Sequence, residues 1–244
     1  DEELKKHAGY KMIYHEEKLN AKTAVLAKGS DAVVAFVNDD LSADTLRKLK
    51  KRNISCVAMR CAGYNNVDIN YAKEHDMRIV RVPAYSPYAV AEHAMGMLLT
   101  LNRKLYRAYN RIREYNFSLN GLTGFDLHGK TVGVIGTGKI GRVFMDICKG
   151  FGMNVIAYDP FPIANSDIHY VSLDELFEQA HIISLHCPLT KDSTHMINDE
   201  TIKKMRDGVV ILNTSRGALI NSEALVEGLK DGKIRSAALD VYEE

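Results

Sequence analysis

Short apolar segments alternate with amphipathic segments along most of the chain. Before residue 83 the pattern predicts strands over 11–14, 32–37, 54–59 and 77–82, with helices over 42–51 and 67–74. After residue 130 it predicts strands over 131–135, 154–158, 182–187, 209–213 and 235–241, with helices over 139–150, 172–179, 198–205 and 222–230. Ser172 and Glu175 form a capping-box pattern at the start of one helix. Strands that alternate with helices predict an α/β protein with parallel sheets covered by helices on both faces.

A stretch that begins and ends with proline, 83–87, separates the two series. A long helical pattern follows over 88–115. The apolar side chains of this pattern form one broad face: Ala91, Met95, Leu98, Leu99 and Leu101. Two interpretations remain open, a spine between domains that also contacts a second subunit, or a helix packed within one core. The proline-containing stretch predicts a domain boundary, with a first domain at 1–84 and a second at 85–244.

The composition is that of a globular protein with nearly balanced charge. Of 244 residues 46% are hydrophobic, and the formal net charge of +1 gives no reason to expect nucleic acid or a membrane as a partner. The basic run over 103–113 is typical of a solvated helix face. The four cysteines form no CxxC pair, which favours free thiols in the reducing cytoplasm. No histidine, cysteine and acid cluster has metal-ligand spacing, so we expect no metal.

The strongest motif is Gly136-x-Gly138-x-x-Gly141, which follows an apolar run and opens a helical pattern. A second apolar run ends in Asp159, eighteen residues after the last glycine. This is the sequence form of a βαβ unit that binds a dinucleotide: the glycines allow a tight turn and a close approach of the backbone to a pyrophosphate. A carboxylate at Asp159 suits the ribose hydroxyls and repels a 2′-phosphate, so the sequence favours NAD over NADP.

Polar residues follow the other predicted strands of the second series, where ligands of open α/β sheets lie. Arg216 comes between a small polar run and a glycine, and its guanidinium suits bidentate binding of a carboxylate. The alternative is a pair with a surface acid. Asp240 can accept from a nicotinamide carboxamide or cap a following helix. Cys187 has no dedicated base and His186 lies in an apolar strand, so we expect neither to be a catalytic group.

In the first series, Gly63 and Tyr64 precede a predicted helix, whose N-terminus suits an anion. Tyr85 lies in the proline-containing stretch between the two series, and its hydroxyl can donate a hydrogen bond to a bound acid. The alternative for both tyrosines is partial burial with a satisfied hydroxyl.

Six ordered motifs together resemble the D-2-hydroxyacid dehydrogenase family, above all its D-lactate dehydrogenase branch. They are Arg60-Cys-Ala-Gly-Tyr-Asn-Asn-Val-Asp68, Val82-Pro-Ala-Tyr-Ser-Pro87, Gly136-Thr-Gly-Lys-Ile-Gly141, Leu185-His-Cys-Pro-Leu-Thr190, Asn213-Thr-Ser-Arg-Gly217 and Leu239-Asp-Val-Tyr-Glu243. The resemblance implies a Rossmann-type NAD-binding domain, with a doubly wound parallel sheet, and a flavodoxin-like substrate domain. It also implies reversible hydride transfer between NADH and pyruvate, giving D-lactate, in a homodimer.

The resemblance assigns roles to matching residues. Lys139 and Ile140 are expected at the pyrophosphate and Asp159 at the adenine ribose, and Asp240 at the carboxamide. Arg216 is expected to orient the substrate carboxylate and polarise its carbonyl, and the backbone of Gly63 and Tyr64, with the Tyr85 hydroxyl, to hold the small acid. The remaining expected cofactor contacts are Cys187, Pro188, Ser193, Thr214 and Ser215.

The chain departs from the family pattern at both ends. The family uses a histidine as general acid, tuned by a glutamate, and both fall beyond Glu244. The first strand of the substrate domain and the last strand of the NAD domain are also missing, so we expect this sequence to be part of a longer enzyme and to be inactive alone. The intact mass of the natural protein tests this.

Two other functions remain open at this point. The same family resembles corepressors that sense NAD without catalysis, although the retained stretch around Tyr85 favours an enzyme. A sister dehydrogenase that acts on another 2-keto acid is the second alternative.

Overall fold

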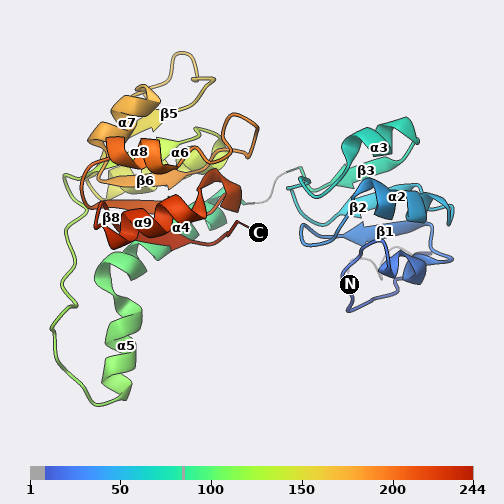
Figure 1. Ribbon diagram of the computed structural model, residues 1–244, viewed down its shortest axis with the longest axis horizontal. Helices are drawn as coiled ribbons and strands as arrows, with labels where there is room; N and C mark the ends of the chain where they lie inside the picture. The colour runs from blue at the N-terminus through green and yellow to red at the C-terminus, as the bar shows by residue number, and fades with distance from the viewer. Residues whose placement is uncertain (1–8, 84–85, 244) are drawn as a thin grey trace. The chain divides into compact units, whose positions relative to one another are not determined.

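The computed structural model describes residues 9–83 and 86–243 and divides into two compact units, Asp1–Tyr85 and Ser86–Glu244 (Figure 1). Each unit has its own parallel sheet and its own core.

The first unit contains a three-stranded parallel sheet in the order β1 (Ala32–Ala35), β2 (Cys56–Met59), β3 (Arg78–Arg81). A 3-10 helix, η1 (Thr23–Ala27), and two helices, α2 (Ala43–Lys50) and α3 (Ile69–Glu74), accompany it. Leu46 and Leu49 of α2 are fully buried against the sheet's core. The helix and strand types of the other predicted elements match the sequence pattern here, with ends that differ by at most two residues.

Two predictions for the first unit need correction. Residues 11–14 form no strand, and three of them, Met12, Ile13 and Tyr14, are exposed. A short apolar run becomes a strand only when a neighbour takes its hydrogen bonds. In the part of the unit that the structure describes, Val34 and Val80 are 55% and 52% exposed, so the described helices cover one face of the sheet rather than two.

The second unit contains a five-stranded sheet in the order β5-β4-β6-β7-β8, parallel throughout. Its strands are β4 (Thr131–Ile135), β5 (Asn154–Tyr158), β6 (Ile182–Leu185), β7 (Val209–Asn213) and β8 (Ile234–Leu239). Its elements outside the sheet are α4 (Pro87–Arg103), α5 (Leu105–Arg113), α6 (Lys139–Gly150), α7 (Leu173–Gln179), α8 (Asp199–Lys204), η2 (Gly217–Leu219) and α9 (Ser222–Lys230). The predicted capping box of Ser172 and Glu175 is present at the start of α7.

Helices cover both faces of this sheet, as predicted. Alternate strand residues point to opposite faces, so Val132 and Val134 of β4 pack with α4 and α6, while Ile135 packs in a second core with α7 and α9. The sheet is therefore doubly wound, and all five residues of β7 are buried.

The strand order changes direction at β4. The chain runs outward from β4 to β5, then returns to the other side of β4 to form β6. The carboxyl ends of β4 and β6 therefore border a topological switch point, where open α/β sheets bind ligands.

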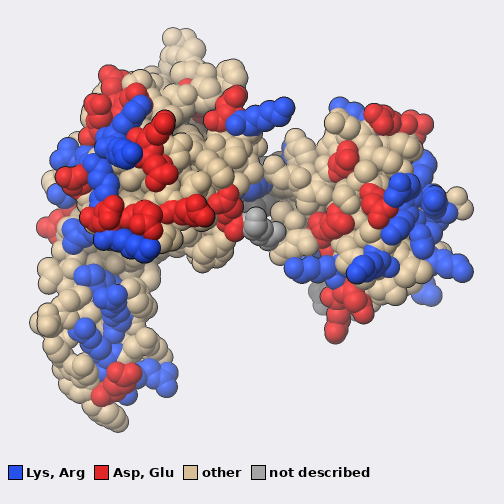
Figure 2. All heavy atoms as spheres, viewed as in Figure 1, with Lys and Arg blue, Asp and Glu red and all other residues tan. Residues whose placement is uncertain are grey.

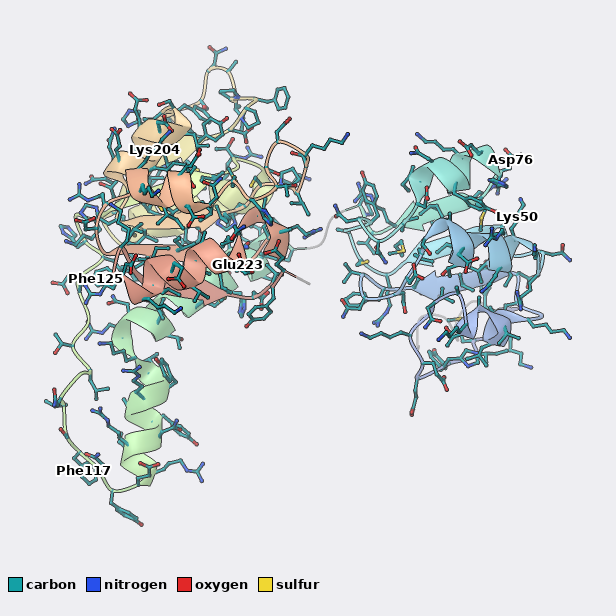
Figure 3. The ribbon with its side chains drawn as sticks, viewed as in Figure 1. Lys50, Asp76, Phe117, Phe125, Lys204 and Glu223 are labelled. Atoms are coloured by element: carbon teal, nitrogen blue, oxygen red, sulfur yellow. The ribbon has the colours of Figure 1, made fainter. Side chains whose placement is uncertain are left out.

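The predicted long helix is divided in two. Lys104 adopts a left-handed conformation, with φ 52°, and separates α4 from α5. Its amine donates to the carbonyls of Gly121 and Thr123, both at 3.0 Å, which fastens the returning chain. We call residues 104–124 the arm. Figure 1 shows α5 projecting away from the sheet, and in Figure 3 Phe117 lies toward the far end of the arm and Phe125 at its base.

Candidate cofactor and substrate site

The glycine turn lies at the switch point, directly after β4. Gly136 has a φ of 97°, which only glycine adopts without strain. A Cβ there would lie 2.7 Å from the Cys187 nitrogen, so the turn packs against the residues that follow β6. The first glycine of the motif is thus required by both its conformation and its surroundings.

The second and third glycines differ in their surroundings. Gly138 is the N-cap of α6 and has no heavy atom within 4 Å of a built Cβ, so the space beside it is open. A Cβ on Gly141 would lie 2.0 Å from the Gly136 carbonyl oxygen. The helix therefore approaches the turn closely at Gly141 and leaves room for a ligand at Gly138. Lys139 and Ile140 begin α6, whose first N–H groups lack intrahelical partners.

Asp159 is fastened to the glycine turn. Its Oδ2 accepts the Thr137 N–H at 2.7 Å and the Thr137 hydroxyl at 2.9 Å, and its Oδ1 accepts the Phe161 N–H at 2.9 Å. Burial alone raises the pKa of Asp159, but these hydrogen bonds outweigh it, and the pKa lies below its ordinary value. The group is therefore a carboxylate at neutral pH, and Oδ1, which accepts a single hydrogen bond, can accept a further one.

Sequence reasoning missed the side chains that complete this arrangement. The Thr137 hydroxyl also bonds the Tyr170 hydroxyl at 2.9 Å, which in turn accepts the Ile163 N–H at 3.1 Å. Tyr170 thus orders the loop beyond Asp159. Only the small size of Thr137 inside the glycine motif signalled a role, whereas Tyr170 gave no local signal.

The residues after β6 lie beneath the turn. Burial lowers the pKa of His186 to about 4, and its Nε2 lies 2.8 Å from the Ser184 hydroxyl. Burial raises the pKa of Cys187 to about 11, and its Sγ lies 3.8 Å from the Met196 sulfur. At neutral pH His186 is therefore neutral and Cys187 is a thiol, without the thiolate that a cysteine nucleophile needs.

The loop that follows Cys187 closes on itself. The Ser193 hydroxyl donates to the Pro188 carbonyl at 2.8 Å and accepts the Thr190 N–H at 2.8 Å. These bonds use Ser193 to shape the loop that carries Pro188.

A second turn follows β7 and carries Arg216. The fully buried Asn213 accepts the Ser215 N–H at 3.0 Å and donates to the Arg216 carbonyl at 2.8 Å, which fixes the turn. The Ser215 hydroxyl donates to the Cys187 carbonyl and joins this turn to the one after β6. Thr214 Oγ1 is buried with no hydrogen-bond partner among the described residues. A buried polar atom without a hydrogen-bond partner fits a site where a bound polar ligand supplies that partner.

Asp240 follows β8 at the same edge of the sheet. Its N–H donates to the Asn213 carbonyl at 3.0 Å, and its Oδ1 lies 3.4 Å from Nε2 of His93 on α4. Asn213 therefore links the loops that carry Arg216 and Asp240.

The structure thus gathers the predicted residues of the second unit at the carboxyl edge of one sheet. They come from the segments that follow β4, β5, β6, β7 and β8: Gly136, Gly138, Lys139, Ile140, Gly141, Asp159, Cys187, Pro188, Ser193, Thr214, Ser215, Arg216 and Asp240.

In the first unit, Gly63 and Tyr64 follow β2 but do not lie at a helix N-terminus, so the prediction that a helix supplies their anion site is wrong. Helix α3 begins at Ile69, and the Asp68 side chain caps it by accepting the Tyr71 N–H at 2.9 Å. The segment is instead braced by Arg81, whose Nη1 donates to the Ala62 carbonyl at 3.1 Å. Tyr85 lies outside the described residues.

Neither a metal site nor a membrane-spanning helix is found in the described residues, 9–83 and 86–243. They contain no group of three histidine, cysteine or acidic side chains placed to hold a metal ion. They also contain no helix long and apolar enough to cross a membrane.

The doubly wound sheet, its glycine turn and Asp159 define a dinucleotide-binding fold. Residues 95–244 match the family described as D-isomer specific 2-hydroxyacid dehydrogenase, NAD binding domain. The chain is 53% identical over 238 residues to D-lactate dehydrogenase of Escherichia coli K12, covering 96% of this chain and 72% of that protein.

Solved structures of 2-hydroxyacid and keto-acid oxidoreductases show the same similarity. The apo-structure of the Escherichia coli D-lactate dehydrogenase matches with a TM-score of 0.91 and 51% identity, over 99% of this chain and 78% of that one. The pyruvate reductase of Chlamydomonas reinhardtii gives 0.87 and 47%, over 94% and 69%. D-lactate dehydrogenase from Aquifex aeolicus, complexed with NAD and lactic acid, gives 0.82 and 36%, over 91% and 67%.

The chain therefore belongs to the D-isomer specific 2-hydroxyacid dehydrogenase family. It is an oxidoreductase that uses NAD. The site residues fit this cofactor, because the open backbone at Gly138, the carboxylate of Asp159 and the orphaned hydroxyl of Thr214 present what a dinucleotide needs.

Proposed function

We propose that this protein reduces pyruvate to D-lactate with NADH, in a reversible reaction. The observation that carries the proposal is the placement of Arg216 on a fixed turn at the cofactor edge of the sheet. The similarity to a D-lactate dehydrogenase and to a pyruvate reductase supports the choice of acid.

In this proposal the second unit holds the cofactor. The N–H groups at Gly138, Lys139, Ile140 and Gly141 bind the pyrophosphate, where the positive end of the α6 dipole assists. Asp159 accepts the ribose hydroxyls. Bound NADH supplies the hydride; the protein supplies binding, orientation and charge.

The cofactor's far end meets the residues after β6, β7 and β8. Cys187 and Pro188 border the nicotinamide side, with Ser193 shaping their loop. Asp240 accepts the carboxamide. Thr214 and Ser215 line the space between, and the buried Thr214 Oγ1 gains the partner that it lacks here.

Arg216 binds the substrate carboxylate and polarises the keto group. A planar guanidinium can bind a carboxylate through two parallel hydrogen bonds, which fixes the orientation of a molecule as small as pyruvate. From the family resemblance we also propose the backbone of Gly63 and Tyr64 and the hydroxyl of Tyr85 as ligands of the acid.

Reduction of a keto group also needs a proton donor beside the developing alkoxide. We assign none of the described histidines to this step. His186 is buried and neutral, with a pKa near 4, and His195 is paired with Glu243.

We also propose a homodimer that uses the arm. Helix α5 buries none of its residues, and Leu105, Tyr109 and Ile112 share one face at 54%, 60% and 58% exposure. Figure 2 shows basic side chains along the same arm, and the sequence of α5 contains three arginines, Arg107, Arg111 and Arg113. An exposed apolar face on a projecting helix suits a second copy of the chain.

Four free cysteines support a cytoplasmic location.

The test uses the protein expressed from its gene. NADH oxidation is measured with pyruvate, glyoxylate and a branched 2-keto acid, and the product is resolved on a chiral column. We expect the highest kcat/KM with pyruvate and D-lactate as the sole product. Tight NADH binding without turnover of any keto acid contradicts the proposal and favours an NAD-sensing binding protein. A higher kcat/KM with another acid favours a sister dehydrogenase.

A further inference from the structure

Glu243 joins three segments of the second unit. Its Oε1 is hydrogen-bonded to His195 Nε2, in the loop between β6 and α8. Its Oε2 accepts the Ser222 N–H at 3.2 Å and the Ser222 hydroxyl at 3.0 Å, at the start of α9. One carboxylate thus ties the chain beyond β8 to two other elements. In Figure 3 the label of Glu223, the residue after Ser222, marks the first turn of α9.

These segments surround the residues that follow Arg216. The His195 N–H donates to the Ala218 carbonyl at 2.8 Å, so the histidine is bound to η2 through its backbone and to Glu243 through its ring. A Cβ on Gly217 would lie 1.8 Å from the Tyr242 carbonyl oxygen. The chain beyond β8 therefore crosses directly against the residue next to Arg216.

The crossing segment also carries Asp240. Asn213 holds the start of both loops, since its side chain donates to the Arg216 carbonyl and its carbonyl accepts the Asp240 N–H. Glu243 holds their far ends. The loops that carry the proposed carboxylate and carboxamide ligands are thus fastened to each other at both ends.

We propose that Glu243, His195 and Ser222 form a clasp that positions Arg216 against the substrate carboxylate. The inference rests on the proposed function of Arg216 and adds three positioning residues to it. None of the three is placed at the reacting atoms; each acts through η2 and the crossing segment.

The clasp lies at the surface rather than in the core. The side chains of His195 and Glu243 are 38% and 28% exposed, and neither belongs to the buried cluster beneath η2. Hydrogen bonds from His195 and Ser222 lower the pKa of Glu243, so Glu243 is a carboxylate at neutral pH. We expect its loss to leave the glycine turn intact, because β4 and β5 lie on the other side of β6.

The test compares four variants of the protein expressed from its gene. Glu243→Gln places an amide donor opposite the donors of the clasp, and His195→Ala removes the ring. His195→Gln restores a nitrogen donor at a similar reach, and Glu227→Gln removes a carboxylate of α9 that pairs with Lys230 outside the clasp. The readouts are kcat and KM for pyruvate, the Kd of the non-reacting analogue oxamate in the presence of NADH, and the Kd of NADH.

For Glu243→Gln and His195→Ala we expect KM and the oxamate Kd to rise about tenfold, with kcat and the NADH Kd changed less than about threefold. His195→Gln is expected to recover most of the loss, and Glu227→Gln to behave as wild type. Wild-type KM and oxamate affinity in both clasp variants overturns the proposal. So does an equal loss of NADH and oxamate affinity, which marks a general structural defect.

Hydrogen exchange separates failure of the clasp from failure of the proposed function. The amides of 214–219 and 240–243 are expected to exchange faster in Glu243→Gln than in wild type, while those of 136–141 stay unchanged. Unchanged exchange at both segments overturns the clasp. Faster exchange in a protein that neither reduces pyruvate nor binds oxamate instead overturns the proposed role of Arg216.

Discussion

The carboxylate of Asp159 accepts the backbone N–H of Thr137 at 2.7 Å, so the acid that follows β5 is bound to the glycine turn that follows β4. This contact spans 22 residues of sequence and holds the proposed ribose ligand beside the proposed pyrophosphate turn. We therefore propose that discrimination between NAD and NADP depends on a carboxylate that the protein itself holds in place.

Asp159→Ala is expected to weaken NADH binding by about tenfold or more, because hydrogen bonds to a charged acceptor contribute about 1.5–3 kcal/mol. NADPH binding is expected to weaken less or to improve, since the repulsion of the 2′-phosphate disappears. Fluorescence titration with both cofactors measures the ratio. Thr137→Val is the control for the hydroxyl that shares Oδ2. An unchanged ratio of the two Kd values in Asp159→Ala contradicts the ribose assignment.

Gly141→Ala is expected to destabilise the second unit by about 1–3 kcal/mol, because a methyl group must fit where the Gly136 oxygen lies 2.0 Å away. The strain pushes α6 from the turn and weakens NADH binding. Gly150→Ala is the matched control at the other end of α6, where nothing lies within 4 Å of the added methyl. Thermal melting and NADH titration of both variants check this, and equal behaviour of the two argues against the close approach.

Arg216→Lys is expected to lower kcat/KM for pyruvate about 100-fold or more, because an ammonium cannot replace a bidentate guanidinium. The NADH Kd is expected to stay within about twofold, since the cofactor is bound mainly by other residues. Steady-state kinetics and NADH titration separate the two effects. Arg206→Lys, at an exposed position before β7, serves as the control. Normal turnover in Arg216→Lys contradicts bidentate binding of the substrate carboxylate by Arg216.

Much of this arrangement could be predicted from the sequence, because the glycine turn and the strand ends are determined by residues that are neighbours in the sequence. The strand that ends at Ile135, the three glycines and Asp159 follow a pattern of apolar runs and turns that each segment carries by itself. The interruption at Lys104 could not be predicted, because its left-handed backbone is stabilised by carbonyls 17 and 19 residues away. The contact of Glu243 with His195 spans 48 residues and leaves no periodic signal.

Stability is expected to fall as the pH is lowered from 6.5 to 4, because of His186. Burial lowers its folded pKa from 6.5 to about 4, so in this range the unfolded chain binds a proton that the folded chain excludes. The contribution is complete above pH 6.5 and is lost toward the folded pKa, a change of about 3 kcal/mol. Urea unfolding without cofactor, at several pH values, measures it. His186→Gln cannot titrate and is expected to flatten this part of the profile; an unchanged slope contradicts the assignment.

Ile112→Asp is expected to convert a dimer into a monomer without unfolding the second unit. Ile112 shares an exposed face of α5 with Leu105 and Tyr109, and no residue of α5 is buried within the chain, so the folded subunit does not depend on it. Burying a carboxylate against the apolar face of a partner, by contrast, carries a large desolvation cost. Asn110→Asp adds the same charge to another face of the same helix and is expected to leave the dimer intact. Sedimentation equilibrium of both variants and the wild type measures the mass. A monomeric wild type, or a dimer that survives Ile112→Asp with full affinity, contradicts the arm as the subunit contact.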